Sequence, residues 1–199
     1  CPGGQAMKSS NSASTAADLP LPQVSEVAPG VLRIKLPLPF LLNHINVWAL
    51  EDGDGWTVVD TGLATRLTKA AWDAALAGPM GGRPVRRVLV THMHPDHVGL
   101  AGWLTERFDC RLWMSRLEYL TCRVLVADTG KAAPQDGVRF YRAAGWSEEQ
   151  IGGYQRRFGQ FGAKVSPLPE SYRRLCDGQV VPIGGRDWTV IMGNGHSPE

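Results

Sequence analysis

The sequence predicts an α/β sandwich, and three observations support this fold class. Segments that alternate apolar and polar residues, as half-buried strands do, occur early in the chain. Segments with helical spacing and short apolar runs follow them. The resulting order of strands, helix, strand, helix and strand is typical of a sheet packed against helices.

The first strands are predicted at residues 31–36 and 45–50. Apolar and polar side chains alternate in the first segment, and two prolines directly after it interrupt the pattern. Residues 52–55, Asp-Gly-Asp-Gly, are a hairpin turn signal. We therefore expect the chain to return along a strand at residues 56–59.

The central segment alternates helices and strands. Residues 63–76 have helical spacing, which Gly78 and Pro79 close. A short apolar strand is predicted at 87–90, a helix at 98–108, and another strand at 110–114.

Residues 116–161 differ from the preceding part of the chain, because strand signals are absent there. Two or three helices are expected, and Ser147 with Gln150 forms a capping-box pattern at the start of one of them. We interpret this stretch as a helical insertion, either a lid over the functional site or a structural excursion. Strands return at 179–183 and 188–192, with a turn at Gly184 and Gly185 between them.

The predicted domain covers residues 24–199. Residues 1–6 precede Met7 and resemble a cloning remnant, so they are excluded from the fold. Residues 8–22 are rich in Ser, Ala and Thr without a period. We therefore interpret residues 1–23 as such a remnant followed by a disordered leader.

Composition narrows the class of protein. The formal net charge is +2 and the basic residues are scattered, so neither nucleic acid nor an anionic membrane is expected as a partner. No apolar run reaches the ~18 residues that span a bilayer, and no signal peptide is visible. Cys110, Cys122 and Cys176 lack the spacing of a disulfide framework, so we expect reduced thiols and a cytoplasmic protein.

Residues 91–97, Thr-His-Met-His-Pro-Asp-His, are the most informative segment. The chain has five histidines, and His92, His94 and His97 lie here beside Asp96. Imidazole nitrogens and carboxylate oxygens are the usual ligands of catalytic zinc and related cations. Because the segment joins a strand to a helix, its loop can turn several of these side chains toward one point. The pattern predicts a metal site.

The segment matches the HxHxDH signature of the metallo-β-lactamase superfamily, and other segments support the resemblance. Residues 58–62, Val-Val-Asp-Thr-Gly, resemble the family's strand that ends in an aspartate beside the metals. Residues 193–198, Gly-Asn-Gly-His-Ser-Pro, resemble its downstream GHSPG-like segment. Residues 38–46 resemble the loop and second strand of glyoxalase-II-like members. The resemblance spans about residues 24–199.

The resemblance implies a metal set. His92, His94 and His196 would bind a first metal, and Asp96 and His97 would contribute to a second. Two divalent metals are expected, with zinc first and iron or manganese as alternatives. A water activated by these metals would be the nucleophile.

The resemblance also implies roles for neighbouring carboxylates. Asp96 would be catalytic, orienting the nucleophile and passing its proton to the leaving group. Asp60 would orient metal ligands by hydrogen bonds; a turn residue at the strand end is the alternative. For His44, either the mouth of the pocket or a surface position is compatible with the sequence.

Two of the family's metal ligands, a bridging aspartate and a last histidine, have no counterpart in these residues. We therefore expect the chain to be the N-terminal part of the family's αββα sandwich and of a larger enzyme. Exposed sheet edges would then favour association, for example as a homodimer.

The first hypothesis for function is a metal-dependent hydrolase that acts on a small-molecule acyl substrate, namely a thioester, a lactone or a related ester. Its basis is the resemblance of residues 38–46 to glyoxalase-II-like proteins. The alternatives are a phosphodiesterase or nuclease, an iron-dependent oxidoreductase of the same fold, and a non-catalytic binding domain with a decayed site. Fold alone does not choose among them.

Overall fold

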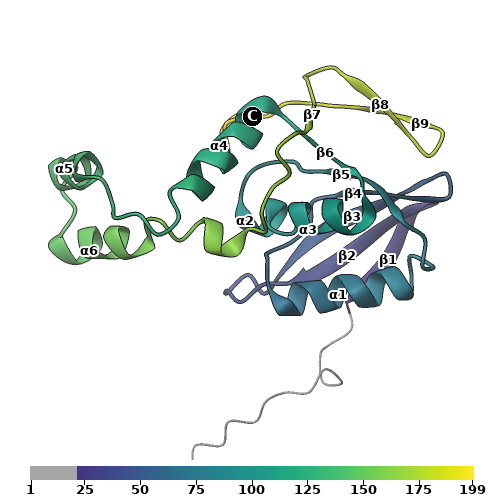
Figure 1. Ribbon diagram of the computed structural model, residues 1–199, viewed down its shortest axis with the longest axis horizontal. Helices are drawn as coiled ribbons and strands as arrows, with labels where there is room; N and C mark the ends of the chain where they lie inside the picture. The colour runs from purple at the N-terminus through teal and green to yellow at the C-terminus, as the bar shows by residue number, and fades with distance from the viewer. Residues whose placement is uncertain (1–21) are drawn as a thin grey trace, which may run out of the picture.

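The computed structural model describes residues 22–199, so all but the last two residues of the predicted leader lie outside it. Figure 1 shows the elements in order. They are β1 (Gln23–Ala28), β2 (Val31–Pro37), β3 (His44–Asp52), β4 (Gly55–Val59), α1 (Arg66–Ala77), β5 (Val85–Leu89), α2 (Pro95–Val98), α3 (Ala101–Phe108), β6 (Arg111–Met114), α4 (Arg116–Ala127), α5 (Gln135–Ala143), α6 (Glu148–Arg157), η2 (Gly162–Lys164), β7 (Arg173–Arg174), β8 (Val180–Ile183) and β9 (Arg186–Thr189).

The centre of the fold is a seven-stranded sheet in the order β1-β2-β3-β4-β5-β6-β7. The first four strands pair antiparallel, as short turns between them allow. From β4 to β7 the pairing is parallel, with helices in the crossovers. The carboxyl ends of β4 and β5 therefore meet at one edge of the sheet, where the predicted site residues begin.

Strand alternation fixes the face that each residue presents. In β2 every second residue is buried, and Ile34 pairs with Val47 of β3. The helices α1 and α3 cover this face: α1 contacts β2, and α3 contacts β5 and β6. Trp72 of α1 is fully buried there, and Thr65 caps the first turn of that helix. This layer is the main hydrophobic core.

The opposite face of the sheet carries the β8–β9 hairpin (Figure 1). Val181 and Ile183 of the hairpin pack with Leu50 and Leu175 in a second, smaller apolar cluster. A cavity of about 500 Å³ lies between the hairpin and the sheet and is lined mainly by apolar side chains.

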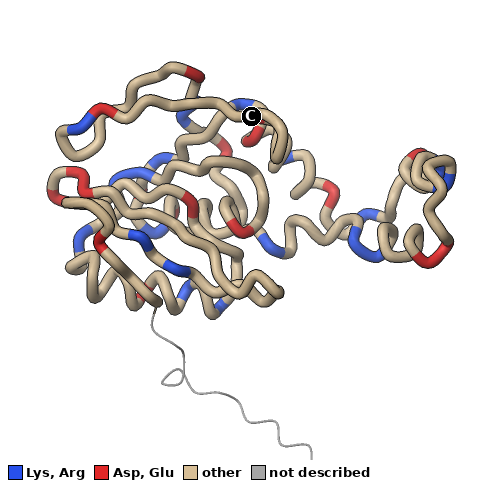
Figure 2. Tube along the Cα trace, turned by 180° about the vertical axis from the view of Figure 1, so that it is seen from behind, with Lys and Arg blue, Asp and Glu red and all other residues tan. Residues whose placement is uncertain are grey.

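The predicted helical insertion is present as three helices, α4, α5 and α6. Residues 128–161, which include α5 and α6 and are called the arm below, project sideways from the body (Figures 1 and 2). The capping box at Ser147 is confirmed: its side chain accepts from Gln150 N, and the Gln150 side chain accepts from Ser147 N. The arm points away from the body, so this structure does not place it as a lid.

Three strands depart from the prediction. β1 was not predicted because it is an edge strand whose side chains are mostly exposed, which leaves no apolar alternation. β7 was not predicted either, because it is only two residues long and both residues are arginines. β9 begins directly after the Gly184–Gly185 turn, at Arg186 rather than at residue 188, because its hairpin register pairs Arg186 with Ile183.

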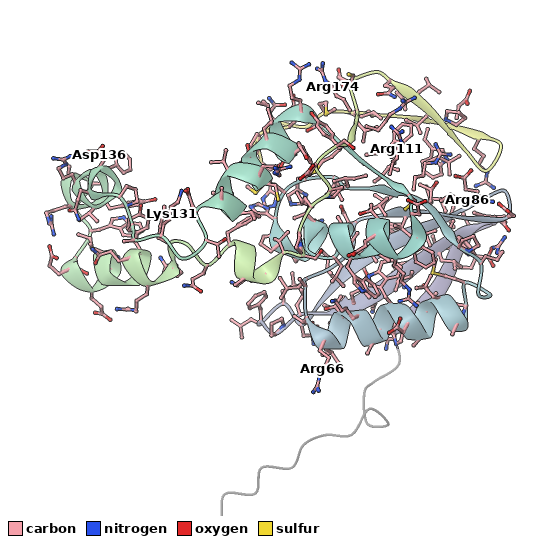
Figure 3. All side chains as sticks on the ribbon, viewed as in Figure 1. Arg66, Arg86, Arg111, Lys131, Asp136 and Arg174 are labelled. Carbon is pink, nitrogen blue, oxygen red and sulfur yellow. The ribbon has the colours of Figure 1, made fainter. Side chains whose placement is uncertain are left out.

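Charged residues of both signs are interspersed over the body and the arm (Figure 2). In Figure 3, Arg66 points away from the body below α1, and Lys131 and Asp136 lie on the arm. None of the helices in residues 22–199 combines the length and the apolar character that a membrane crossing requires.

Candidate metal centre

The site begins where two neighbouring parallel strands end. Asp60 follows β4, and its N–H donates to Leu89 O at the end of β5 (2.8 Å). Asp60 adopts a left-handed backbone conformation, with φ of 63°. Such a conformation costs a non-glycine residue about 1–3 kcal/mol and is kept only where the surroundings enforce it. Here it turns the carboxylate toward the loop after β5.

The loop after β5 leads into the short helix α2. His94 is its N-cap, and Pro95, whose fixed φ suits a first helical turn, is its first residue. Gly99 ends the helix against the turn at Gly62: a Cβ atom at Gly99 would lie 2.5 Å from Gly62 O and 2.3 Å from Pro95 O. The absence of a side chain at position 99 therefore lets α2 pack directly on the segment that contains Asp60.

The structure brings His92 and His94 together with His196, more than a hundred residues downstream. One ligand atom from each lies within 4.8 Å of the others. The ring centroids of His94 and His196 are 4.6 Å apart, and those of His92 and His196 are 5.1 Å apart. We refer to these three residues as the histidine cluster. Its members come from two segments, the loop after β5 and the segment after β9.

A hydrogen-bonded chain sets the tautomer of His92. The Thr91 hydroxyl donates its one proton to the Asp60 carboxylate, at 2.9 Å from Oδ2. Its oxygen lies 2.9 Å from His92 Nδ1, so Nδ1–H must be the donor there. Nε2 of neutral His92 then carries a lone pair, and this buried atom has no hydrogen-bond partner among the described residues.

Asp60 also holds His97, whose Nδ1–H donates to Asp60 Oδ2 at 2.8 Å. Its other nitrogen, Nε2, lies 3.7 Å from Asp96 Oδ2. The ring of His97 is 3.9 Å from that of His92 by centroid distance. Asp96 and His97 thus lie beside the histidine cluster, and Asp60 fixes His97 directly and His92 through Thr91.

The surroundings shift the pKa values of these histidines in opposite directions. Burial disfavours the imidazolium form and lowers the pKa of His92 to about 4, and the neighbouring His97 adds to this. Burial and His196 also lower the pKa of His94. For His97 the effect of burial is overcome by the hydrogen bond to Asp60 and by the charges of Asp60 and Asp96, which raise its pKa. His92 and His94 are therefore neutral at pH 7, as metal ligands must be.

The histidine cluster fits a divalent cation. Tetrahedral zinc with bonds of about 2.1 Å places its ligand atoms roughly 3.4 Å apart. The ligand atoms of His92, His94 and His196 already lie within 4.8 Å of one another. The unpartnered Nε2 of His92 is the atom such a cation would satisfy. His44 lies outside this group: its Nδ1 pairs with Asn43 Oδ1 at 2.8 Å.

Glu118 of α4 contacts the site, and sequence reasoning missed it. It is fully buried, and its carboxyl group accepts a hydrogen bond from Met93 N, between His92 and His94, at 2.7 Å. The spacing of Glu118 and Cys122 puts both on one helix face. That signal indicates burial, but it does not identify a partner 25 residues away in sequence.

Comparisons with known proteins identify the family. A sequence model described as Metallo-beta-lactamase superfamily matches residues 42–199. The chain belongs to this superfamily. Its α/β fold with a central sheet is the metallo-β-lactamase fold, which confirms the predicted fold class, and the fold implies binding of divalent metal.

The chain matches only part of the length of individual relatives. The chain is 38% identical to a β-lactamase domain protein from Burkholderia ambifaria, with a TM-score of 0.75 over 88% of this chain and 50% of that one. The chain is 26% identical to a metallo-β-lactamase family protein from Thermus thermophilus, with a TM-score of 0.67 over 86% of this chain and 54% of that one. A "Probable metallo-hydrolase" from Bacillus subtilis (strain 168) is 39% identical over 74 residues, which are 37% of this chain and 31% of that protein. The chain thus spans about half the length of these solved structures and about a third of the curated relative.

Proposed function

We propose that this chain carries the metal site of a metal-dependent hydrolase. The observation that carries the proposal is the convergence of His92, His94 and His196 around the unpartnered Nε2 of His92. A bound divalent cation would lower the pKa of water and so provide hydroxide at neutral pH. Two cations, zinc in each position, are proposed for the whole protein, with Asp96 and His97 contributing to the second.

The chain's own residues have separable tasks in this proposal. Asp60 and Thr91 hold His92 in the tautomer that leaves its Nε2 atom without a partner, and Asp60 accepts from Nδ1–H of His97, whose Nε2 lies 3.7 Å from Asp96 Oδ2. Asp96 is partly exposed, with 29% of its side chain accessible, so it is within reach of solvent and substrate. A carboxylate in that position can orient a nucleophile and transfer its proton to the leaving group.

The proposed substrate is a small acyl compound: a thioester, a lactone or a related ester. Support comes from the resemblance of residues 38–46 to the corresponding segment of glyoxalase-II-like proteins. The relative from Bacillus subtilis is described as a probable metallo-hydrolase, which agrees with hydrolysis and leaves the substrate open. Likeness to the β-lactamase BJP-1 of Bradyrhizobium japonicum, at 16% identity, bears on the fold alone.

The test compares His94→Ala with His44→Ala in the whole protein. Metal content is measured first, because zinc supports the hydrolase and bound iron with oxygen consumption supports the oxidoreductase alternative. Turnover is then measured on thioester, lactone, β-lactam and phosphodiester substrates. We expect His94→Ala to abolish metal uptake and thioester or lactone cleavage, while His44→Ala retains both. Unchanged turnover in His94→Ala would refute the proposal.

A further inference from the structure

One buried carboxyl group joins the two segments that carry the histidine cluster. Glu118 is fully buried in α4. Its Oε2 accepts from Met93 N at 2.7 Å, and its Oε1 accepts from Glu199 N at 2.9 Å. Met93 lies between two members of the cluster, and Glu199 lies three residues after the third. No other carboxyl group among the described residues is hydrogen-bonded to both segments.

The chemistry of this contact requires a carboxylate. Two backbone N–H donors converge on the group, one on each oxygen, so both oxygens must accept. A glutamine at position 118 would offer one acceptor and would turn an NH2 group toward the second N–H. In a buried position the donor left without a partner is costly, and hydrogen bonds to a charged acceptor are stronger than neutral ones.

The segment that contains His196 has few other anchors after Met192, whose N–H donates to Asp177 Oδ1 at 2.9 Å. Residues 190–199 belong to no strand or helix, and Ile191 is largely exposed. Besides its N–H, Glu199 contributes its Oε2, which accepts from Leu117 N at the start of α4 at 3.0 Å. Position 199 is thus held on α4 by two hydrogen bonds, one of which ends on Glu118.

We infer that Glu118 is a positioning residue that holds His196 at ligand distance from His92 and His94 and thereby sets the affinity for metal. This inference rests on the proposed function, in which these histidines bind a divalent cation. Glu118 touches neither cation nor substrate in this arrangement. Its effect is transmitted through the backbone at Met93 and Glu199.

The first experiment compares Glu118→Gln, which keeps the size of the side chain, with Glu106→Gln, an exposed position on α3. Zinc affinity is measured by competition with a chromophoric chelator, and ligand geometry by the visible spectrum of the cobalt-substituted protein. We expect Glu118→Gln to weaken zinc binding about 10–100-fold, the range found when groups that orient ligands are removed, and to shift the cobalt bands. Glu106→Gln should change neither quantity.

A second pair of variants tests the same contact without altering α4. Glu199→Pro removes the N–H group that donates to Glu118, together with the side-chain acceptor of Leu117 N. Glu199→Ala loses the same side-chain acceptor and keeps the N–H group, so the two variants differ in the contact with Glu118. Only the proline variant should reproduce the weakened affinity and the shifted cobalt spectrum. This pair keeps the inference testable if a change at position 118 prevents folding.

Failure of the inference differs from failure of the proposed function. If His94→Ala abolishes zinc binding while Glu118→Gln and Glu199→Pro bind zinc within about twofold of the wild type, with unchanged cobalt spectra, Glu118 is no positioning residue and the metal site stands. If His94→Ala binds zinc as the wild type does, the proposed function fails with it.

Discussion

The loop after β5 lies between β5 and β6, and the arm lies between β6 and β7. Different kinds of contact stabilise the two segments. In the loop, polar groups are satisfied by residues far away in sequence: Thr91 by Asp60 and Met93 N by Glu118. In the arm, charged side chains pair with near neighbours, as Arg142 does with Glu148. Tyr141 stacks on Trp146, with ring centroids 4.2 Å apart.

The difference shows where the fold concentrates its functional constraints. The loop retains a buried nitrogen without a partner, and the segment beside it a residue in a left-handed conformation, both of which cost free energy. The arm contains its own small core of Val138 and Ile151 and a complete capping box. We therefore expect the body to determine metal binding and the arm to fold largely by local interactions.

The largest expected effect is a loss of stability, which should be greater for a tryptophan of the body than for one of the arm. Trp72 is fully buried in the body, and its Nε1–H donates to Thr61 O at 2.8 Å. Trp72→Ala should lower the free energy of unfolding by about 3–5 kcal/mol. Trp146→Ala in the arm should lower it by about 0.5–1.5 kcal/mol, the contribution of an aromatic pair. Urea denaturation followed by circular dichroism measures both, and equal losses would contradict the distinction.

The next effect concerns the carboxylate of Asp60. Asp60→Asn replaces an oxygen that accepts from Thr91 or His97 with an NH2 group, so one of the two histidines loses its orientation. Zinc affinity should fall about 10–100-fold. Asp54→Asn, which alters an exposed ion pair with Arg86, is the matched control and should leave the affinity unchanged. An affinity for Asp60→Asn that matches this control would mean that Asp60 orients no ligand.

A third prediction concerns pH in the metal-free protein. His92, with a pKa of about 4, binds its proton less readily when folded than when unfolded, so its contribution to stability falls as the pH drops from ~6.5 to 4. His97, with a raised pKa, behaves oppositely: its stabilising effect is complete below the unfolded pKa and is lost as the pH rises through the folded one.

Imidazole NMR signals followed against pH check this prediction. His92 should titrate near pH 4 and His97 above its ordinary pKa. In Asp60→Asn, the pKa of His97 should fall, because burial then acts with less opposition. Titration of both histidines at the same pH would contradict the hydrogen-bond scheme.

The smallest expected effect lies in the arm. Ser147→Ala removes the capping side chain of α6, at a cost of about 1 kcal/mol to that helix. Hydrogen exchange of residues 148–157 should accelerate while zinc affinity stays unchanged. Exchange that does not accelerate would contradict the capping role of Ser147, and a change in zinc affinity would show that the arm is coupled to the metal centre.

The parts of the fold that could be predicted from the sequence are those whose signal is local. The alternation in β2 and the capping box at Ser147 depend on neighbouring residues only, and the structure has both. β1 could not be predicted, because an exposed edge strand does not need alternating apolar residues. The start of β9 was misplaced because hairpin register, rather than residue type, decides where pairing begins.

For the site, the motif identified His92 and His94, and the resemblance added His196 and Asp60. The structure adds how these residues are held together. Thr91 and Glu118 act through partners that lie 31 and 25 residues away in sequence, and no spacing rule reveals such contacts. Roles that depend on tertiary hydrogen bonds therefore become visible only in the fold.

The most direct test of the metal site is an anomalous difference map from a crystal of the zinc-loaded protein. We predict a zinc peak within about 2.0–2.1 Å of one imidazole nitrogen each from His92, His94 and His196. A zinc peak bound elsewhere, with these three side chains free of metal, would contradict the assignment.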